Sequence, residues 1–220
     1  MKIFGFDFSI IKPAMFYYDT ETKQSEFYCW PASEDKKSIE ILNNAGIVVR
    51  NRNLPPLSKN DYDSNSLVFE NTKRAAELSE LITEDIMNIV GDEPLDNIYI
   101  CSEGLAFASN GNQTLDLSGY KAALLTTLYK RGVRNIFTYS PITIKSVAGC
   151  SKKGMWTKDF MINAIKKTNP SLHTFIRTLS ENEKSLKKVT AFVPCVDDLV
   201  DAYWVVRTFM ERHLKMSLLS

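Results

Sequence analysis

The sequence predicts a single α/β domain with a mixed five-stranded sheet flanked by helices. Three strand-like runs rich in aromatic and β-branched residues come first, and later strand-like runs alternate with segments of helical periodicity. The first three strands should therefore pair antiparallel, whereas strands joined through helices should be parallel. The chain has 220 residues, of which 44% are hydrophobic, and this is enough for one sizeable core. No internal repeat or low-complexity linker divides it.

Each expected element follows from a local pattern. The strands are short apolar runs at residues 2–10, 14–20, 25–30, 97–102 and 133–139, with a possible further strand at 47–50. The helices have apolar residues three and four apart, at 38–44, 69–90, 115–131, 142–148, 157–167 and 197–210. Gly91 and Gly132 directly follow two of them, as glycines that stop helices do. Residues 34–67 are rich in Asn, Pro and Ser and are expected to form an insertion, and 171–190 a long loop.

Positive charge is concentrated in one part of the chain. The net charge is +1, yet residues 118–168 contain ten Lys or Arg and only one acid, Asp159. The remainder is acidic. A near-neutral total thus combines a basic stretch that could meet phosphates with carboxylates that could bind metal. A solvated helix face is the alternative explanation of the basic stretch.

The cysteines do not predict a zinc site or disulfides. Cys29, Cys101, Cys150 and Cys195 lack close paired spacing, and the chain has only two histidines. No run is long and apolar enough to span a bilayer, and the N-terminus lacks a signal-peptide pattern. We expect reduced thiols and a cytoplasmic protein.

An aspartate lies inside the first predicted strand. Because side chains alternate in a strand, Asp7 shares one face with Ile3, Gly5 and Ser9. Aspartate is depleted in strands and costly to bury without a partner. Asp7 is therefore either hydrogen-bonded by a neighbour or retained for chemistry, and the residue alone does not decide between the two.

Further carboxylates follow a strand and begin a helix. Glu103 comes directly after the apolar run NIYICS, although a solvated loop glutamate would look the same. In VDDLVDAYWVV, Asp197 is expected to cap the helix, whereas Asp198 and Asp201 share one face of it. Two like charges held so close raise each other's proton affinity unless a cation lies between them, and a divalent metal ion is the simplest such cation.

If these acids converge, they offer hard oxygen ligands and no soft ones. Asp7, Glu103, Asp198 and Asp201 would then suit Mg²⁺, with Mn²⁺ as a substitute, and would suit zinc poorly. Such clusters hold two ions roughly 4 Å apart and hydrolyse phosphodiesters. The acids thus predict a nuclease.

The context of these acids resembles the RuvC branch of the RNase H superfamily. IFGFDFS is similar to the family's first strand, with Gly5, Asp7 and Ser9 in place of its glycine, catalytic Asp and DNA-proximal Ser or Thr. IYICSEG resembles the strand that ends in the catalytic Glu, here Glu103, and LDLSGYKAAL the helix that follows. DLVDAYWVV resembles the closing helix with its last two acids. Phe107 is the candidate for the aromatic that intrudes at the junction, one position later than expected.

A further motif concerns the cleaved backbone. YSPITIKSVAGCSKKGMWTK resembles the stretch that approaches the scissile phosphate. The places of its proline, two lysines and loop glycines are taken by Pro141, Lys145, Lys158, Gly149 and Gly154. The loop is about two residues longer here. Lys152 and Lys153 are expected to hold the DNA backbone, or else to lie in a solvated loop.

The resemblance covers about half the chain and implies a resolvase of four-way (Holliday) junctions. It implies two metal ions per active site, symmetric nicks that leave 5′-phosphates, and a homodimer. The helices near Phe69 and Leu115 are the expected interface, although packing into the core also explains their apolar stripes. The segment at 34–67 and a loop at 171–190 are longer than a minimal bacterial member needs, and a phage or viral member of the family would explain them. Arg212 and His213 match no part of the family pattern.

Three alternatives remain open. A related nuclease of the same fold would cut flaps, forks or RNA:DNA hybrids. A sugar-kinase or actin-like ATPase shares the strand order and an early Asp, but Asp7-Phe8-Ser9 is not followed by a glycine-rich phosphate loop. A catalytically dead DNA-binding protein would not need all four acids.

Overall fold

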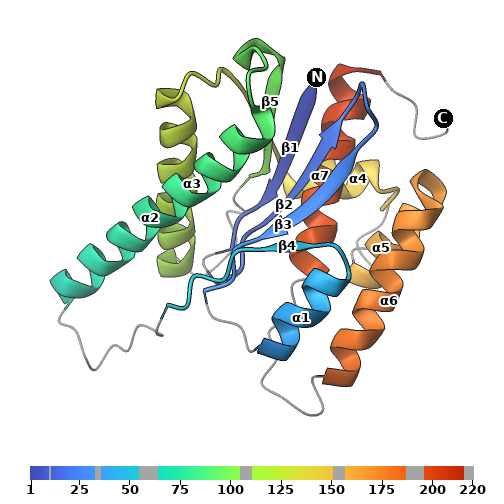
Figure 1. The fold of residues 1–220 in the computed structure, drawn as a ribbon, viewed down its shortest axis with the longest axis horizontal. Helices are drawn as coiled ribbons and strands as arrows, with labels where there is room; N and C mark the ends of the chain where they lie inside the picture. The colour runs from blue at the N-terminus through green and yellow to red at the C-terminus, as the bar shows by residue number, and fades with distance from the viewer. Residues whose placement is uncertain are drawn as a thin grey trace.

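A six-stranded mixed sheet forms the centre of the protein, with helices on both faces (Figure 1). The computed structural model describes residues 1–9, 11–32, 36–54, 64–104, 111–150, 157–186 and 196–215. The strand order is β4-β3-β2-β1-β5-β6. The strands are β1 (Lys2–Asp7), β2 (Ala14–Asp19), β3 (Ser25–Cys29), β4 (Val48–Val49), β5 (Ile98–Glu103) and β6 (Asn135–Tyr139).

The predicted strand directions are confirmed, but the predicted number of strands is wrong. β1, β2 and β3 pair antiparallel, and β5 and β6 continue the sheet parallel to β1. The sixth strand is β4, which pairs with Tyr28 and Cys29 of β3. It lies within the possible further strand that the sequence indicated at 47–50, which the five-stranded prediction did not count.

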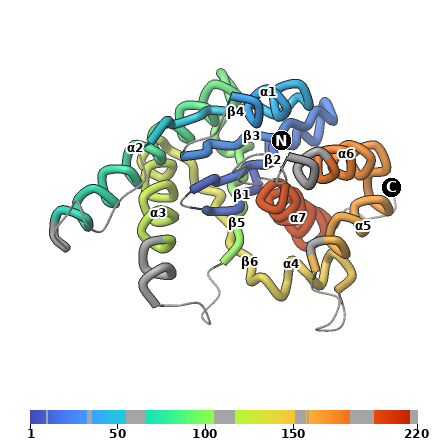
Figure 2. Tube along the Cα trace, turned by 90° about the horizontal axis from the view of Figure 1, so that it is seen from below, coloured from blue at the N-terminus to red at the C-terminus, as the bar shows by residue number. Residues whose placement is uncertain are grey.

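Two helices cover one face of the sheet, and a larger group covers the other. The helices are α1 (Lys36–Asn44), α2 (Ser64–Val90), α3 (Gly111–Lys130), α4 (Pro141–Val147), α5 (Lys158–Thr168), α6 (Pro170–Leu186) and α7 (Val196–His213), with a 3₁₀ turn η1 at Leu95–Asn97. Figures 1 and 2 show α2 and α3 on one face, and α7 with α4, α5 and α6 on the other. The expected loop at 171–190 is wrong over the extent of α6, where Ile176 and Leu179 are buried at helical spacing.

Alternation in β1 divides the core into two parts. Phe4 and Phe6 pack on the α2 and α3 side, and Ile3 packs on the α7 side. Gly5 lies directly under α7, where an added Cβ would be 2.5 Å from Val206 Cγ2. The glycine therefore lets α7 pack closely against β1, the central strand.

The segment 36–54 is integrated into the sheet. Its Arg50 lies 3.3 Å from the buried carboxylate of Asp85 in α2, and Trp30 donates a 2.8 Å hydrogen bond to the same side chain. Arg52 donates through Nε to the Trp30 carbonyl. Whether 34–67 is an insertion relative to other proteins remains a prediction.

The three described cysteines are reduced. Cys29, Cys101 and Cys150 are buried free thiols, and burial raises the pKa of Cys101 and Cys150.

Among the residues placed by the structure, no helix is both long and apolar enough to cross a membrane.

Candidate active site

Two of the predicted acids end neighbouring parallel strands. Asp7 is the last residue of β1 and Glu103 the last of β5, each directly after the paired residues Phe6 and Ser102. Alternation places both on the α7 face, because Ile3 and Cys101 pack into the core on that side. Asp7 and Glu103 therefore lie side by side at the carboxyl edge of the sheet, where ligands bind in open α/β sheets.

The other two acids come from the first turns of α7. Asp198 and Asp201 are half-buried on one face of the helix, although Val200 and Ala202 beside Asp201 are fully buried. Asp197 is exposed. Since α7 begins at Val196, Asp197 lies within the first turn and is not the N-cap that the sequence predicted. There it still favours the helix dipole.

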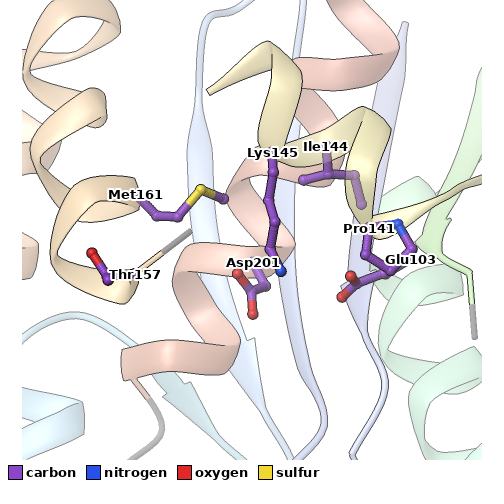
Figure 3. A pocket seen from close by; sticks show the side chains of 7 residues that line it. All are labelled: Glu103, Pro141, Ile144, Lys145, Thr157, Met161 and Asp201. Carbon is purple, nitrogen blue, oxygen red and sulfur yellow. The ribbon is translucent and has the colours of Figure 1, made fainter. Parts of the chain in front are cut away.

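A small cavity lies at the carboxyl edge of the sheet, between residues of β5, α4, α5 and α7. Its volume is about 100 Å³, and it is lined by Glu103, Pro141, Ile144, Lys145, Thr157, Met161 and Asp201. Figure 3 shows the amine of Lys145 directed between the carboxylates of Glu103 and Asp201. The cavity thus holds two predicted metal ligands and one predicted phosphate contact, drawn from β5, α4 and α7.

Local capping explains how α4 presents its lysine. The side-chain oxygen of Ser140 accepts a 3.2 Å hydrogen bond from the Thr143 amide, and Pro141 occupies the first helical turn. This fixes the start of the helix at the end of β6, so that Lys145 follows one turn later. Thr157 caps α5 in the same way, through the Phe160 amide.

A lysine that the sequence analysis did not single out reaches the same acids. Nζ of Lys12 lies 3.4 Å from Oδ2 of Asp198, and both side chains are largely buried. The Lys12 amide donates to Ser9 Oγ at 3.3 Å, and Arg52 donates to the Ile11 carbonyl at 3.2 Å. The loop after β1 is thus fastened so that Lys12 faces α7. Only its position a few residues after Asp7 could have indicated this.

The four acids gather at one edge but do not form a ready metal cage. Within the described part of the chain, no three His, Cys, Asp or Glu side chains lie close enough to hold one ion. Instead, the ammonium groups of Lys12 and Lys145 lie among the carboxylates. Since the donors are carboxylate oxygens near the open end of the sheet, their chemistry fits a hard divalent cation.

The remaining predicted DNA contacts are only partly described. Ser9 lies in the loop after β1, and Lys158 is the first residue of α5, although its side chain is outside the described part. Phe107, Lys152 and Lys153, together with Gly154, lie outside the described residues.

The described basic residues of 118–168 do not all lie on one side of the protein. Lys130 ends α3, and Arg131 and Arg134 follow it just before β6, so all three lie at the opposite edge from Glu103. Arg134 packs 4.1 Å from the ring of Tyr129. Lys121 is buried. Of the described basic residues of this stretch, Lys145 is the one that lines the cavity.

Comparisons with known proteins agree with the fold. No family model and no curated protein matches the sequence. Two solved structures are similar over 96% of each chain: Thermus thermophilus RuvC, with 14% identity and a TM-score of 0.50, and T. thermophilus RuvC in complex with a Holliday junction substrate, with 12% identity and a TM-score of 0.51. Both come from a bacterium, so the expected phage or viral origin gains no support. Identity this low shows the fold alone, and that fold is the RNase H-like fold of RuvC.

Proposed function

We propose that this protein is a metal-dependent endonuclease that resolves four-way DNA junctions. The observation that carries the proposal is the cavity at the carboxyl edge of the sheet, where Glu103, Asp201 and Lys145 point into one space. Asp7 lies beside Glu103, and Asp198 lies one turn before Asp201. The similar structure of RuvC with a Holliday junction substrate supports the choice of DNA substrate.

The carboxylates have the role of holding metal. Asp7, Glu103, Asp198 and Asp201 would bind two Mg²⁺ ions, for which Mn²⁺ substitutes. When bound, such ions activate water and stabilise charge on the leaving oxygen, and cleavage leaves 5′-phosphates. Lys145 is placed to neutralise the scissile phosphate, which is where fixed cations contribute most to phosphoryl transfer.

Other residues would hold the DNA around this centre. We assign backbone contacts to Ser9, Lys152 and Lys153, and a contact with the junction bases to Phe107. Phosphate contacts of this kind orient the nucleic acid without reading its sequence. Lys158 is assigned the same catalytic role as Lys145, to neutralise charge at the scissile phosphate. The protein would work in the cytoplasm, of a bacterium or of a host cell.

Two symmetric nicks require two active sites, so the proposal includes a two-fold homodimer. The N-terminal half of α2 extends beyond the body of the protein (Figure 2). There Val68 and Phe69 are 65% and 68% exposed, and an apolar groove of about 300 Å³ separates α2 from α3 near Ala75 and Ala123. A second copy would cover this surface. Light scattering coupled to size exclusion should give about twice the mass of 25.0 kDa.

Substrate choice is tested by cleavage of a panel of DNAs. The purified protein with Mg²⁺ should nick a four-way junction at symmetric positions and spare a linear duplex. Asp7→Asn should abolish cutting and leave junction binding largely intact. Preferred cutting of a flap, a fork or an RNA:DNA hybrid would assign the other nuclease activity, and retained cutting by Asp7→Asn would refute the metal assignment.

A further inference from the structure

Lys121 in α3 is a charged residue inside the protein. Only 8% of its surface is exposed, although a lysine normally keeps its ammonium in water. Burial lowers the pKa of Lys121, and the nearby Glu103 opposes this shift. Burying the charge works against stability, so the fold alone does not explain why a lysine is here.

The ammonium of Lys121 contacts the main chain of a proposed metal ligand. Its Nζ donates a 2.6 Å hydrogen bond to the carbonyl oxygen of Glu103. Hydrogen bonds from a charged donor are shorter and stronger than neutral ones. The bond fixes the chain at the residue whose side chain enters the cavity.

The next residue is held from the opposite direction. The Gly104 amide donates a 2.6 Å hydrogen bond to the Tyr139 carbonyl in β6, and a Cβ at Gly104 would lie 3.2 Å from that oxygen. Glu103 and Gly104 are thus held between α3 on one side and β6 on the other. Glu103 is the last residue of β5.

We infer that Lys121 is a positioning residue, which holds the Glu103 main chain so that its carboxylate enters the active site. This inference rests on the proposed nuclease function. Lys121 acts from the α3 side of the sheet, opposite α7, and acts through Glu103. Its positive charge interacts with Glu103, while Lys121 itself does not line the cavity.

The test compares Lys121→Met with Lys130→Met, an exposed lysine at the end of the same helix. Met fills a similar volume without donating a hydrogen bond. We expect Lys121→Met to lower kcat for junction cleavage about 10- to 100-fold with KM nearly unchanged, while Tm stays the same or rises. Amide hydrogen exchange over residues 98–104 should become faster. Lys130→Met should match the wild type in every measurement.

The outcomes separate this inference from the proposed function. A wild-type protein that cuts no DNA refutes the nuclease, but exchange over residues 98–104 in Lys121→Met still reports whether Lys121 holds the strand end. Wild-type kcat and exchange in Lys121→Met would overturn the inference. If Lys121→Met does not fold, Lys121→Gln, which keeps a neutral hydrogen-bond donor, takes its place. A loss of kcat in Lys121→Gln that only equals the loss of folded protein would also overturn the inference.

Discussion

Gly5 and Ala202 approach each other so closely that a Cβ on Gly5 would lie 2.6 Å from the Ala202 carbonyl oxygen. The contact joins the middle of the first strand to the first half of the last helix. It lies two residues before Asp7 and one residue after Asp201, so this close packing sets the spacing between two of the proposed metal ligands.

Gly5→Ala should therefore weaken both fold and site. The added methyl group would meet backbone as well as the Val206 side chain, so α7 must move outward. Overpacking of this kind costs roughly 1–3 kcal/mol. We expect lower Tm and strongly reduced cleavage even at temperatures where the variant is folded. Gly119→Ala is a control for Tm alone, because a Cβ there meets nothing within 4 Å but Gly119 lines the groove of the proposed dimer. A Gly5→Ala protein with wild-type Tm and rate would contradict the argument.

Lys12→Met should increase affinity for divalent metal. The Lys12 ammonium lies 3.4 Å from Asp198 and competes with any cation for that carboxylate. Since partly exposed ion pairs contribute about 0.2–1 kcal/mol, the dissociation constant for Mn²⁺ should fall up to roughly fivefold. Isothermal titration in the absence of DNA measures this, with the exposed Lys36→Met as control. Unchanged or weaker binding would show that Lys12 does not oppose the metal.

Lys145→Met should reduce the rate of cleavage more than it reduces binding. Lys145 reaches the cavity between Glu103 and Asp201 and is placed to meet charge that develops at the phosphate. Loss of one such group lowers kcat about 100-fold. Single-turnover cleavage and gel-shift binding distinguish the two effects. Loss of binding with an unchanged rate would instead make Lys145 an ordinary backbone contact.

Asp19 should link stability to pH. Burial alone would raise its pKa, but hydrogen bonds from the Glu21 and Thr22 amides and from Lys2 outweigh burial and lower it. A lowered pKa means that the folded state favours the carboxylate, so its contribution is full above the unfolded pKa of 3.8 and is lost as pH falls through the lower, folded value.

Asp19→Asn should consequently reduce the free energy of unfolding at neutral pH by roughly 1–3 kcal/mol. The difference in free energy of unfolding between wild type and Asp19→Asn should disappear as pH falls below about 4, because the wild-type carboxyl then becomes protonated. Urea unfolding across pH measures both. The exposed Asp92→Asn serves as control at the same end of the sheet, and a gap that is independent of pH would exclude the carboxylate as its cause.

Most of the fold could be predicted because its strands and helices carry strong local patterns. The alternation around Asp7 predicted the faces of β1 correctly, with Phe4 and Phe6 on one side and Ile3 on the other. Helix α6 was missed, although Ile176 and Leu179 are spaced as on one helical face and Pro170 is well suited to a first helical turn.

The site was harder to predict, because partners distant in sequence determine its details. The pairing of Glu103 with Asp201 in one cavity follows from motif order, but Lys12 and Lys121 gave no local signal. Their roles depend on the docking of α7 and α3 against strand ends. Lys121 even belonged to the basic stretch expected to meet phosphate, whereas burial directs it to a carbonyl oxygen.

The dependence on α7 also has a consequence during protein synthesis. Asp198 and Asp201 are made 191 and 194 residues after Asp7. At 5–20 residues per second, roughly 10 to 40 seconds separate them. If the proposed function holds, a nascent chain cannot damage DNA throughout that interval, and a prematurely terminated product that lacks the final helix is harmless.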